Sequence, residues 1–181
     1  MSERDDTSTI ATLSALLEDY RAHGSRLGAQ GFWAVAVYRY GRWAQARSNR
    51  LARKGLGLHY RVLHKAVQVV GGIELPREAE VGRHFIIDHA GGIVISGFAK
   101  LGDNCRVRPG VVIGLADVDD PCAPELGDNV DVGAGAKVLG RIRVGNNVRI
   151  GANAVVVRDV PDDSIAVGVP AVVKPRKRDA G

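Results

Sequence analysis

The chain has 181 residues, with 25 Lys and Arg against 20 Asp and Glu, which gives a formal net charge of +5. This length excludes two full-sized domains but allows one globular domain, or a small helical region joined to a repeat domain. Two cysteines, a polar and acidic start and no apolar run of membrane-spanning length predict a cytoplasmic protein without a disulfide framework or a membrane partner.

The positive charge favours anionic ligands but does not identify which one binds. Much of the excess lies in two clusters, at residues 47–54 and 174–178, and neither contains aromatic side chains. Proteins that bind single-stranded nucleic acids stack the bases on such side chains. We therefore expect solvated charge here and no nucleic-acid partner.

Residues 1–72 are predicted to form a helical region. The segment GFWAVAVYRYGRWAQ at 31–45 is apolar on most sides, which is typical of a helix buried between others or against a partner subunit. Gly71 and Gly72 are expected to end the helical pattern. Apolar residues recur at helical spacing on either side of this segment, first at Ile10, Leu13, Leu17 and Tyr20, and later at Tyr60, Leu63, Val67 and Val70.

Residues 73–173 have a period of six, and an aliphatic residue opens each unit. Such a repeat makes neither a helix face nor a hairpin, so each unit supplies a short strand and a turn, and stacked coils bury the aliphatic column. This predicts a parallel β-helix, followed by a basic tail at 174–181. The openers are Val81, Ile87 and Ile93, then, after a two-residue slip, Leu101, Val107 and Ile113, and after a longer interruption Leu126, Val132, Val138, Val144, Ile150 and Val156.

Two further expectations follow from this repeat. Small residues recur four places after an opener, at Cys105, Ala136 and Ala154, so Cys105 is interpreted as a filler of a tight corner rather than a nucleophile. A stack of coils also leaves strand edges open, so an N-terminal helical cap and self-association are both expected.

Three segments carry a resemblance to the serine acetyltransferases, a branch of the hexapeptide acyltransferases. The first is the helix at 31–45, and the second is GIELPREAEVGRHFIIDHAGGIVI at 72–95. The third is GDNVDVGAGAKVLGRIRVGNNVRIGANAVVVRDVP at 127–161, followed by GVPAVV. The resemblance implies a left-handed β-helix that assembles into trimers or dimers of trimers, with active sites between subunits. It also implies the reaction of L-serine with acetyl-CoA to give O-acetylserine and CoA, a step of cysteine biosynthesis.

His89 matches the catalytic histidine of that family. A neutral alcohol is a poor nucleophile, so acetyl transfer to a hydroxyl needs a base, and histidine is suited to the role. Glu74, fifteen residues earlier and about one coil below, is the candidate partner for the other ring nitrogen. Asp88 matches the family's residue that contacts the amino group of the acceptor. The alternatives are a structural histidine on a turn, a solvated Glu74 and an Asp88 that caps the turn.

The family's coenzyme site matches a second group of residues. Ala134, Gly135 and Ala152 match main-chain positions that line its pantetheine groove, although tight corner packing fits the same letters. Backbone N–H groups around Gly114 are candidate donors to the oxyanion. Candidates for the phosphates of the coenzyme are Arg149, Lys174 and Arg176, although a solvated tail equally explains the last two.

The sequence differs from the family pattern in the loop that, in the family, binds the carboxylate of serine. The family has an Arg-His pair before a proline, whereas here Cys122 and Ala123 precede Pro124, and the surrounding loop is acidic, with Asp117, Asp119 and Asp120. Serine is therefore the first candidate acceptor, and another small hydroxyl or amine, such as a sugar or a biosynthetic intermediate, is the alternative.

Two other functional classes are alternatives to acyl transfer. A zinc hydratase on the same fold needs three histidines, and beyond His84 and His89 the remaining ones lie in the helical region, so no metal is expected. A non-catalytic scaffold that uses the β-helix only for trimerisation is the other alternative.

Overall fold

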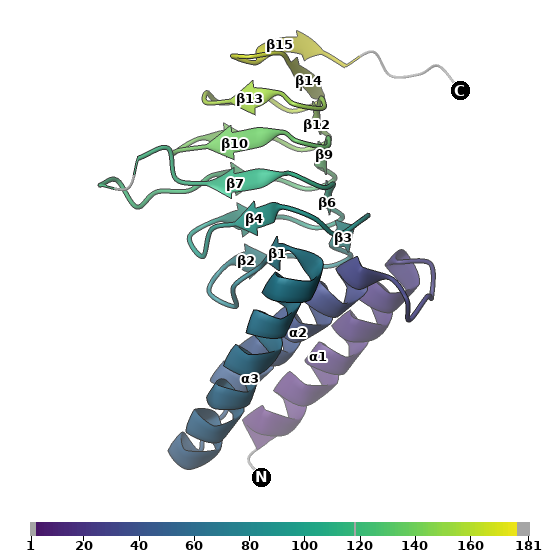
Figure 1. Ribbon diagram of the computed structural model, residues 1–181, viewed down its shortest axis with the longest axis vertical. Helices are drawn as coiled ribbons and strands as arrows, with labels where there is room; N and C mark the ends of the chain where they lie inside the picture. The colour runs from purple at the N-terminus through teal and green to yellow at the C-terminus, as the bar shows by residue number, and fades with distance from the viewer. Residues whose placement is uncertain (1–2, 118, 177–181) are drawn as a thin grey trace.

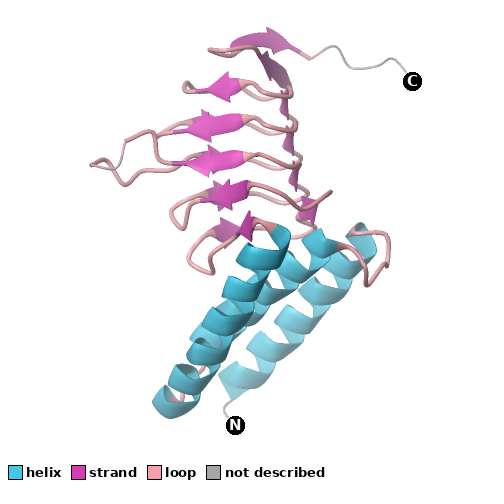
Figure 2. Ribbon diagram, viewed as in Figure 1, coloured by secondary structure: helices cyan, strands magenta, loops and turns pink. Residues whose placement is uncertain are grey.

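The computed structural model describes residues 3–117 and 119–176, with side chains from residue 12 onward within these ranges. Three helices form a bundle: α1 (Glu3–Ala22), α2 (Gln30–Gln45) and α3 (Arg50–Gly71). From Ile73 the chain winds into coils stacked on one end of this bundle (Figures 1 and 2). Within the described residues, no helix combines the length and apolar character needed to cross a bilayer.

The coils are built from three parallel sheets that the chain visits in turn. The first sheet is β1 (Ile73–Glu74), β4 (Ile93–Ile95), β7 (Val112–Gly114), β10 (Lys137–Leu139) and β13 (Val155–Val156). The second is β2 (Glu80–Val81), β5 (Lys100–Leu101), β8 (Glu125–Leu126) and β11 (Arg143–Val144). The third is β3 (Ile86–Ile87), β6 (Arg106–Val107), β9 (Asp131–Val132), β12 (Arg149–Ile150), β14 (Ser164–Val167) and the antiparallel β15 (Val172–Pro175). This is a parallel β-helix, as the six-residue period predicts.

The aliphatic columns fill the interior of the coils. The predicted openers from Ile87 to Val156 are all buried, whereas Val81, on the first coil, is partly exposed. Cys105, Ala136 and Ala154 have no exposed surface, which confirms them as corner residues. The six-residue repeat therefore identifies the core correctly.

The two-residue slip lies one turn earlier than predicted. Ile87 pairs with Val107 and Ile95 pairs with Ile113, so Ile95, not Ile93, is the opener of its unit. The side chains of a strand alternate, and both Ile93 and Ile95 point inward and are fully buried, so the count of six fits either of them. The two extra residues consequently lie in the turn between β3 and β4, which carries His89.

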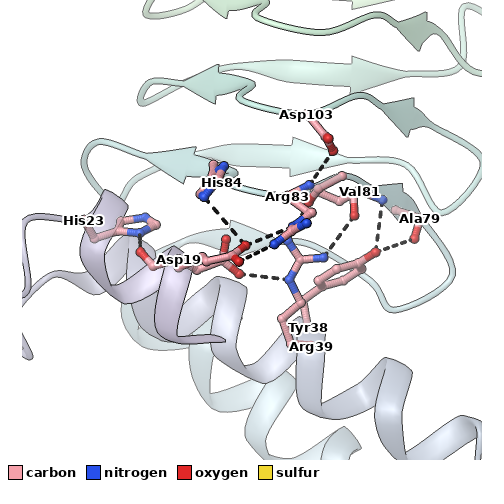
Figure 3. Close-up of polar contacts among 11 residues, drawn as sticks. Asp19, His23, Tyr38, Arg39, Ala79, Val81, Arg83, His84 and Asp103 are labelled. Atoms are coloured by element: carbon pink, nitrogen blue, oxygen red, sulfur yellow. Dashed lines mark hydrogen bonds and ion pairs between the residues drawn. The ribbon is translucent and has the colours of Figure 1, made fainter. Parts of the chain in front are cut away.

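The helical bundle caps the open edge of the second sheet, as predicted. The Tyr38 hydroxyl donates to the Ala79 carbonyl (2.9 Å) and accepts from the Val81 N–H (3.1 Å), so it replaces the missing neighbour strand of β2 (Figure 3). Arg39 donates to the carbonyls of Val81 (3.0 Å) and Gly82 (2.5 Å). Because an unpaired buried backbone group is costly, these contacts stabilise the first coil.

A histidine caps the edge of the third sheet. The Nε2 atom of His23 accepts a hydrogen bond from the Ile87 N–H (3.2 Å), and its Nδ1 lies 2.7 Å from the Asp19 carbonyl oxygen. Since Nε2 accepts, Nδ1 carries the proton, and the ring is the neutral Nδ1–H tautomer. Asp19 is itself buried and pairs with Arg39 Nε at 2.9 Å, which joins α1 to α2.

The helices form where the sequence predicts them. Helix α2 packs against α1, α3 and β3, and Gly72, at a φ of +61°, ends α3. The apolar positions of α1 and α3 are not all covered, however, since Leu13, Leu17 and Val70 are 60%, 50% and 80% exposed. The periodicity identifies an apolar face but not the surface that covers it. The side chain of Ile10 lies outside the described residues.

Candidate active site

His89 lies on the longest of the turns that join the third sheet to the first. The segment from Ile87 to Ile95 is two residues longer than the segment from Val107 to Ile113, with which it pairs at both ends, and Gly91 and Gly92 within it have φ values of +119° and +65°. His89 is exposed, and its ring makes no hydrogen bond or ion pair with another described residue. Its ring nitrogens are therefore available to a ligand.

A column of small residues continues from His89 along this corner. Counting on from the paired strands β3, β6, β9 and β12, His89 is followed on successive coils by Pro109, Ala134 and Ala152. The Gly135 N–H donates to the Pro109 carbonyl and the Asn153 N–H donates to the Ala134 carbonyl, each at 2.8 Å. Three strand spacings correspond to about 14 Å from His89 to Ala152. Ala134 and Ala152 are exposed, so a narrow ligand can approach the main chain there.

The two glycines predicted for the coenzyme site differ in their surroundings. Gly135 has a φ of +73°, and a Cβ there would lie 2.0 Å from the Asn153 Oδ1 atom, so corner packing alone requires glycine. Gly114 is buried at the end of β7, where a Cβ would meet only Ser96, at an ordinary 3.7 Å. It lies at the opposite end of the strands from the His89 turn, because β4 begins after that turn whereas the neighbouring β7 ends at Gly114.

Glu74 does not form a hydrogen bond with His89 among the described residues. It is exposed on β1 and pairs in register with Val94, five residues beyond His89. Its charge acts on His64 of α3: burial lowers the pKa of His64, and the Glu74 carboxylate opposes that shift. The single chain therefore places Glu74 on the first coil, beside α3.

Asp88 is held by two arginines from the next coil. Its Oδ1 lies 3.2 Å from Arg106 Nη1, and its Oδ2 lies 3.3 Å from Arg108 Nε. Arg108 also pairs with Asp131, a contact that raises the pKa of its guanidinium. Arg106 and Arg108 are not among the site residues predicted from the sequence. The signal that would have found them is the 20-residue separation of Asp88 and Arg108, which equals the separation of the openers Ile87 and Val107, one coil apart.

The long loop between β7 and β8 lies apart from His89 in the single chain. It projects from the side of the coils (Figure 1). Cys122 and Ala123 line a cavity of about 480 Å³ together with Arg141 and Arg143. A hydrogen bond with the Cys122 thiol and an ion pair with Arg141 (3.2 Å) lower the pKa of Asp120.

Two of the three residues predicted to meet phosphates lie on one face of the third sheet. Arg149 pairs in register with Ile165, which pairs with Lys174, so one strand lies between the two cations, and both are exposed. Arg176 instead donates to the Asn147 carbonyl at 3.2 Å. Lys174 belongs to β15, and residues 177–181 of the predicted tail lie outside the described residues.

The remaining histidine and cysteine candidates have structural contacts. The Nδ1 atom of His84 lies 3.1 Å from Asn104 Oδ1, and its Nε2 lies 3.6 Å from a Glu18 carboxylate oxygen. Burial raises the pKa of the Cys105 thiol to about 11, as expected of a corner residue without nucleophilic function. In the part of the chain that the structure describes, no three His, Cys, Asp or Glu side chains are grouped to hold a metal ion.

Known proteins to which this chain is similar belong to one family. A model of the bacterial transferase hexapeptide (six repeats) matches residues 123–158. The serine acetyltransferase of Synechococcus elongatus is 40% identical over 144 residues, which are 79% of this chain but 56% of that protein. The chain thus spans little more than half the length of this curated relative.

Solved structures agree with this match. The serine acetyltransferase of Neisseria gonorrhoeae superposes with a TM-score of 0.78 at 30% identity, over 94% of this chain and 68% of that one. The serine acetyltransferase of Brucella abortus has a TM-score of 0.80 at 27% identity, over 97% of this chain and 75% of that one.

Proposed function

The chain belongs to the serine acetyltransferase family, and we propose that it transfers the acetyl group of acetyl-CoA to the hydroxyl of L-serine. The observation that carries this proposal is the position of His89. It is an exposed imidazole, without a hydrogen-bond or ion-pair partner among the described residues, at the first position of the corner column that continues through Ala134 and Ala152. A base and an extended acyl donor can therefore share one edge of the coils.

His89 acts as the general base in this proposal. As the serine hydroxyl attacks the carbonyl carbon of the thioester, the neutral imidazole takes its proton. The tetrahedral intermediate then collapses, the C–S bond breaks, and the imidazolium returns the proton to the leaving CoA thiolate. Glu74 is the proposed carboxylate partner, which stabilises the imidazolium from the first strand of the same coil. Asp88 is the proposed partner of the serine ammonium group.

The coenzyme is proposed to lie along the corner column. Its pantetheine arm contacts the main chain at Ala134, Gly135 and Ala152, and its phosphates meet Arg149 and Lys174. These two cations are exposed on the third sheet, which leads into this corner. Arginine and lysine bind phosphate through charge-assisted hydrogen bonds.

Gly114 supports the further proposal that the active site forms between copies of the chain. It ends β7, and the His89 turn precedes β4, so the two lie at opposite ends of neighbouring strands; its backbone N–H is proposed to meet an oxyanion beside the His89 of a neighbouring copy. We propose a left-handed β-helix that assembles as a trimer, or a dimer of trimers, in the cytoplasm, without a metal. The proposed biological role is the serine acetylation step of cysteine biosynthesis.

The proposal is tested by following thiol release from acetyl-CoA with purified protein and a panel of small alcohols and amines. L-serine is expected to give the highest kcat/KM, and mass spectrometry of the product is expected to show O-acetylserine. If another acceptor, such as a sugar, exceeds serine, or if no acceptor releases the thiol, the proposal is wrong.

A further inference from the structure

Arg106 has an unused hydrogen-bonding edge beside the proposed catalytic turn. Its Nη1 atom lies 3.2 Å from Asp88 Oδ1, and its other two nitrogens have no acceptor among the described residues. A guanidinium offers five N–H donors in a planar fork, so most of its donors are free. Its side chain is 42% exposed, which leaves this fork accessible to a small molecule.

Arg108 differs from Arg106 in this respect. Its Nε lies 3.3 Å from Asp88 Oδ2, and its two terminal nitrogens lie within hydrogen-bonding distance of the Asp131 carboxylate. All three nitrogens are therefore occupied by the protein. Arg108 fixes the position of Asp88, and Arg106 is left as the cation that can bind something else.

The charges of this cluster suit a zwitterion. Asp88, Arg106, Arg108 and Asp131 sum to zero, so the cluster does not attract a single ion of one sign strongly. Asp88 keeps unused acceptor sites, because two nitrogens contact a carboxylate that has about four lone-pair positions. An ammonium and a carboxylate held side by side match the free sites of Asp88 and Arg106.

We infer that Arg106 binds the α-carboxylate of the amino-acid acceptor while Asp88 binds its α-ammonium group. This inference rests on the proposed function, since it takes serine as the acceptor. Asp88 precedes His89 directly, and the ammonium, carboxylate and hydroxymethyl groups of serine share one carbon. A serine held by Asp88 and Arg106 therefore presents its hydroxyl to the His89 turn. Neither Cys122 nor Ala123 of the long loop carries a cation for this role.

The test compares serine with serinamide, which keeps the hydroxyl and the ammonium but lacks the carboxylate. In wild type, kcat/KM is expected to favour serine. In Arg106→Gln, the serine value is expected to fall about 10- to 100-fold, as for loss of hydrogen bonds to a charged group, whereas the serinamide value changes less than about threefold. Arg106→Lys, which keeps the charge but not the fork, is expected to be intermediate.

Arg143→Gln is the matched control. Arg143 also opens a two-residue strand followed by a buried valine, but on the second sheet, where it is 83% exposed and pairs with Glu125. It is expected to behave as wild type, and the KM for acetyl-CoA is expected to stay within about twofold in every variant. Circular dichroism melting curves confirm that each variant is folded.

The outcomes separate this inference from the proposed function. If wild type shows no serine-dependent thiol release, the proposed function is wrong, and the inference fails with it. If wild type is active and Arg106→Gln keeps the preference for serine over serinamide, the inference alone is overturned. A rise in the KM for acetyl-CoA instead of serine in Arg106→Gln also overturns it, because Arg106 would then bind the coenzyme phosphates.

Discussion

Ala152 lies one coil beyond Ala134 at the same corner of the β-helix. His89 lies at this corner too, two coils before Ala134. The Asn153 N–H donates to the Ala134 carbonyl at 2.8 Å, so the spacing of the two alanines is fixed by the main chain. In the proposed complex the acyl donor lies along this column, and the methyl side chains leave it room. This relationship leads directly to a steric test.

Ala134→Leu is expected to raise the KM for acetyl-CoA at least about tenfold, which corresponds to a loss of about 1.4 kcal/mol of binding free energy. The longer side chain stands where the pantetheine arm is proposed to lie, whereas the KM for serine is expected to change less than about threefold. Ala66→Leu, at an exposed position of α3, is the control. Equal coenzyme KM values in Ala134→Leu and wild type would contradict the proposed position of the coenzyme.

The cap of the β-helix is tested by Tyr38→Phe. This change leaves the Ala79 carbonyl and the Val81 N–H without their hydroxyl partner in a buried environment. The free energy of unfolding, measured with urea, is expected to fall by about 1–3 kcal/mol. Tyr40→Phe removes an exposed hydroxyl bonded to His59 and is expected to change it by less than about 0.5 kcal/mol. Similar values for the two variants would show that the hydroxyl of Tyr38 does not stabilise the first coil.

Replacement by alanine is expected to change the stability of the protein in opposite directions at two glycines in the helices. A Cβ at Gly31 would lie 2.0 Å from the Ile87 carbonyl oxygen, so Gly31→Ala pushes α2 away from β3 and is expected to destabilise the protein by about 1–3 kcal/mol. At Gly55 no described atom beyond the adjacent residues and the surrounding helix backbone lies within 4 Å of an added Cβ. Gly55→Ala is therefore expected to stabilise α3 by up to about 1 kcal/mol. Thermal unfolding measures both, and a neutral Gly31→Ala would argue against close packing of α2 on β3.

The two thiols are expected to differ in reactivity. The thiolate is the reactive form, and burial raises the pKa of Cys105 to about 11, so this residue is almost fully protonated at pH 8 as well as inaccessible. A hydrogen bond with Asp120 also raises the pKa of the Cys122 thiol, but Cys122 is partly exposed on the long loop, so a reagent can reach it. At pH 8 a disulfide reagent is expected to modify one thiol per folded chain, and the second only in denaturant. Cys122→Ser is expected to abolish the native reaction, whereas two fast thiols in the folded protein would contradict the burial of Cys105.

The six-residue repeat predicts the core because one local rule holds in every coil of the β-helix: the aliphatic residue that opens each six-residue unit points into the interior. Val132 pairs with Ile150 and Val138 pairs with Val156, and in both pairs the second residue follows the first by three units of six. The rule fails where two inward positions are both isoleucine, as at Ile93 and Ile95, since neither hydrophobicity nor spacing then distinguishes them.

Part of the candidate site was missed for a different reason. The ion pairs of Asp88 with Arg106 and Arg108 join adjacent coils, and the six-residue repeat aligns the buried columns but does not show which exposed side chains of neighbouring coils meet. The resemblance supplied His89 and Asp88, but the residues that hold Asp88 are specific to this chain's register. The exposure of Leu13 and Leu17 could not be predicted from the sequence either, because helical periodicity does not show which surface covers an apolar face.

The central claim is that His89 is the general base, and kcat with serine as acceptor tests it most directly. His89→Gln is expected to lower kcat at least about 100-fold, within the range for a lost general base, while the melting temperature and the Kd for acetyl-CoA stay near the wild-type values. A folded His89→Gln variant that turns over serine at nearly the wild-type rate would contradict the account.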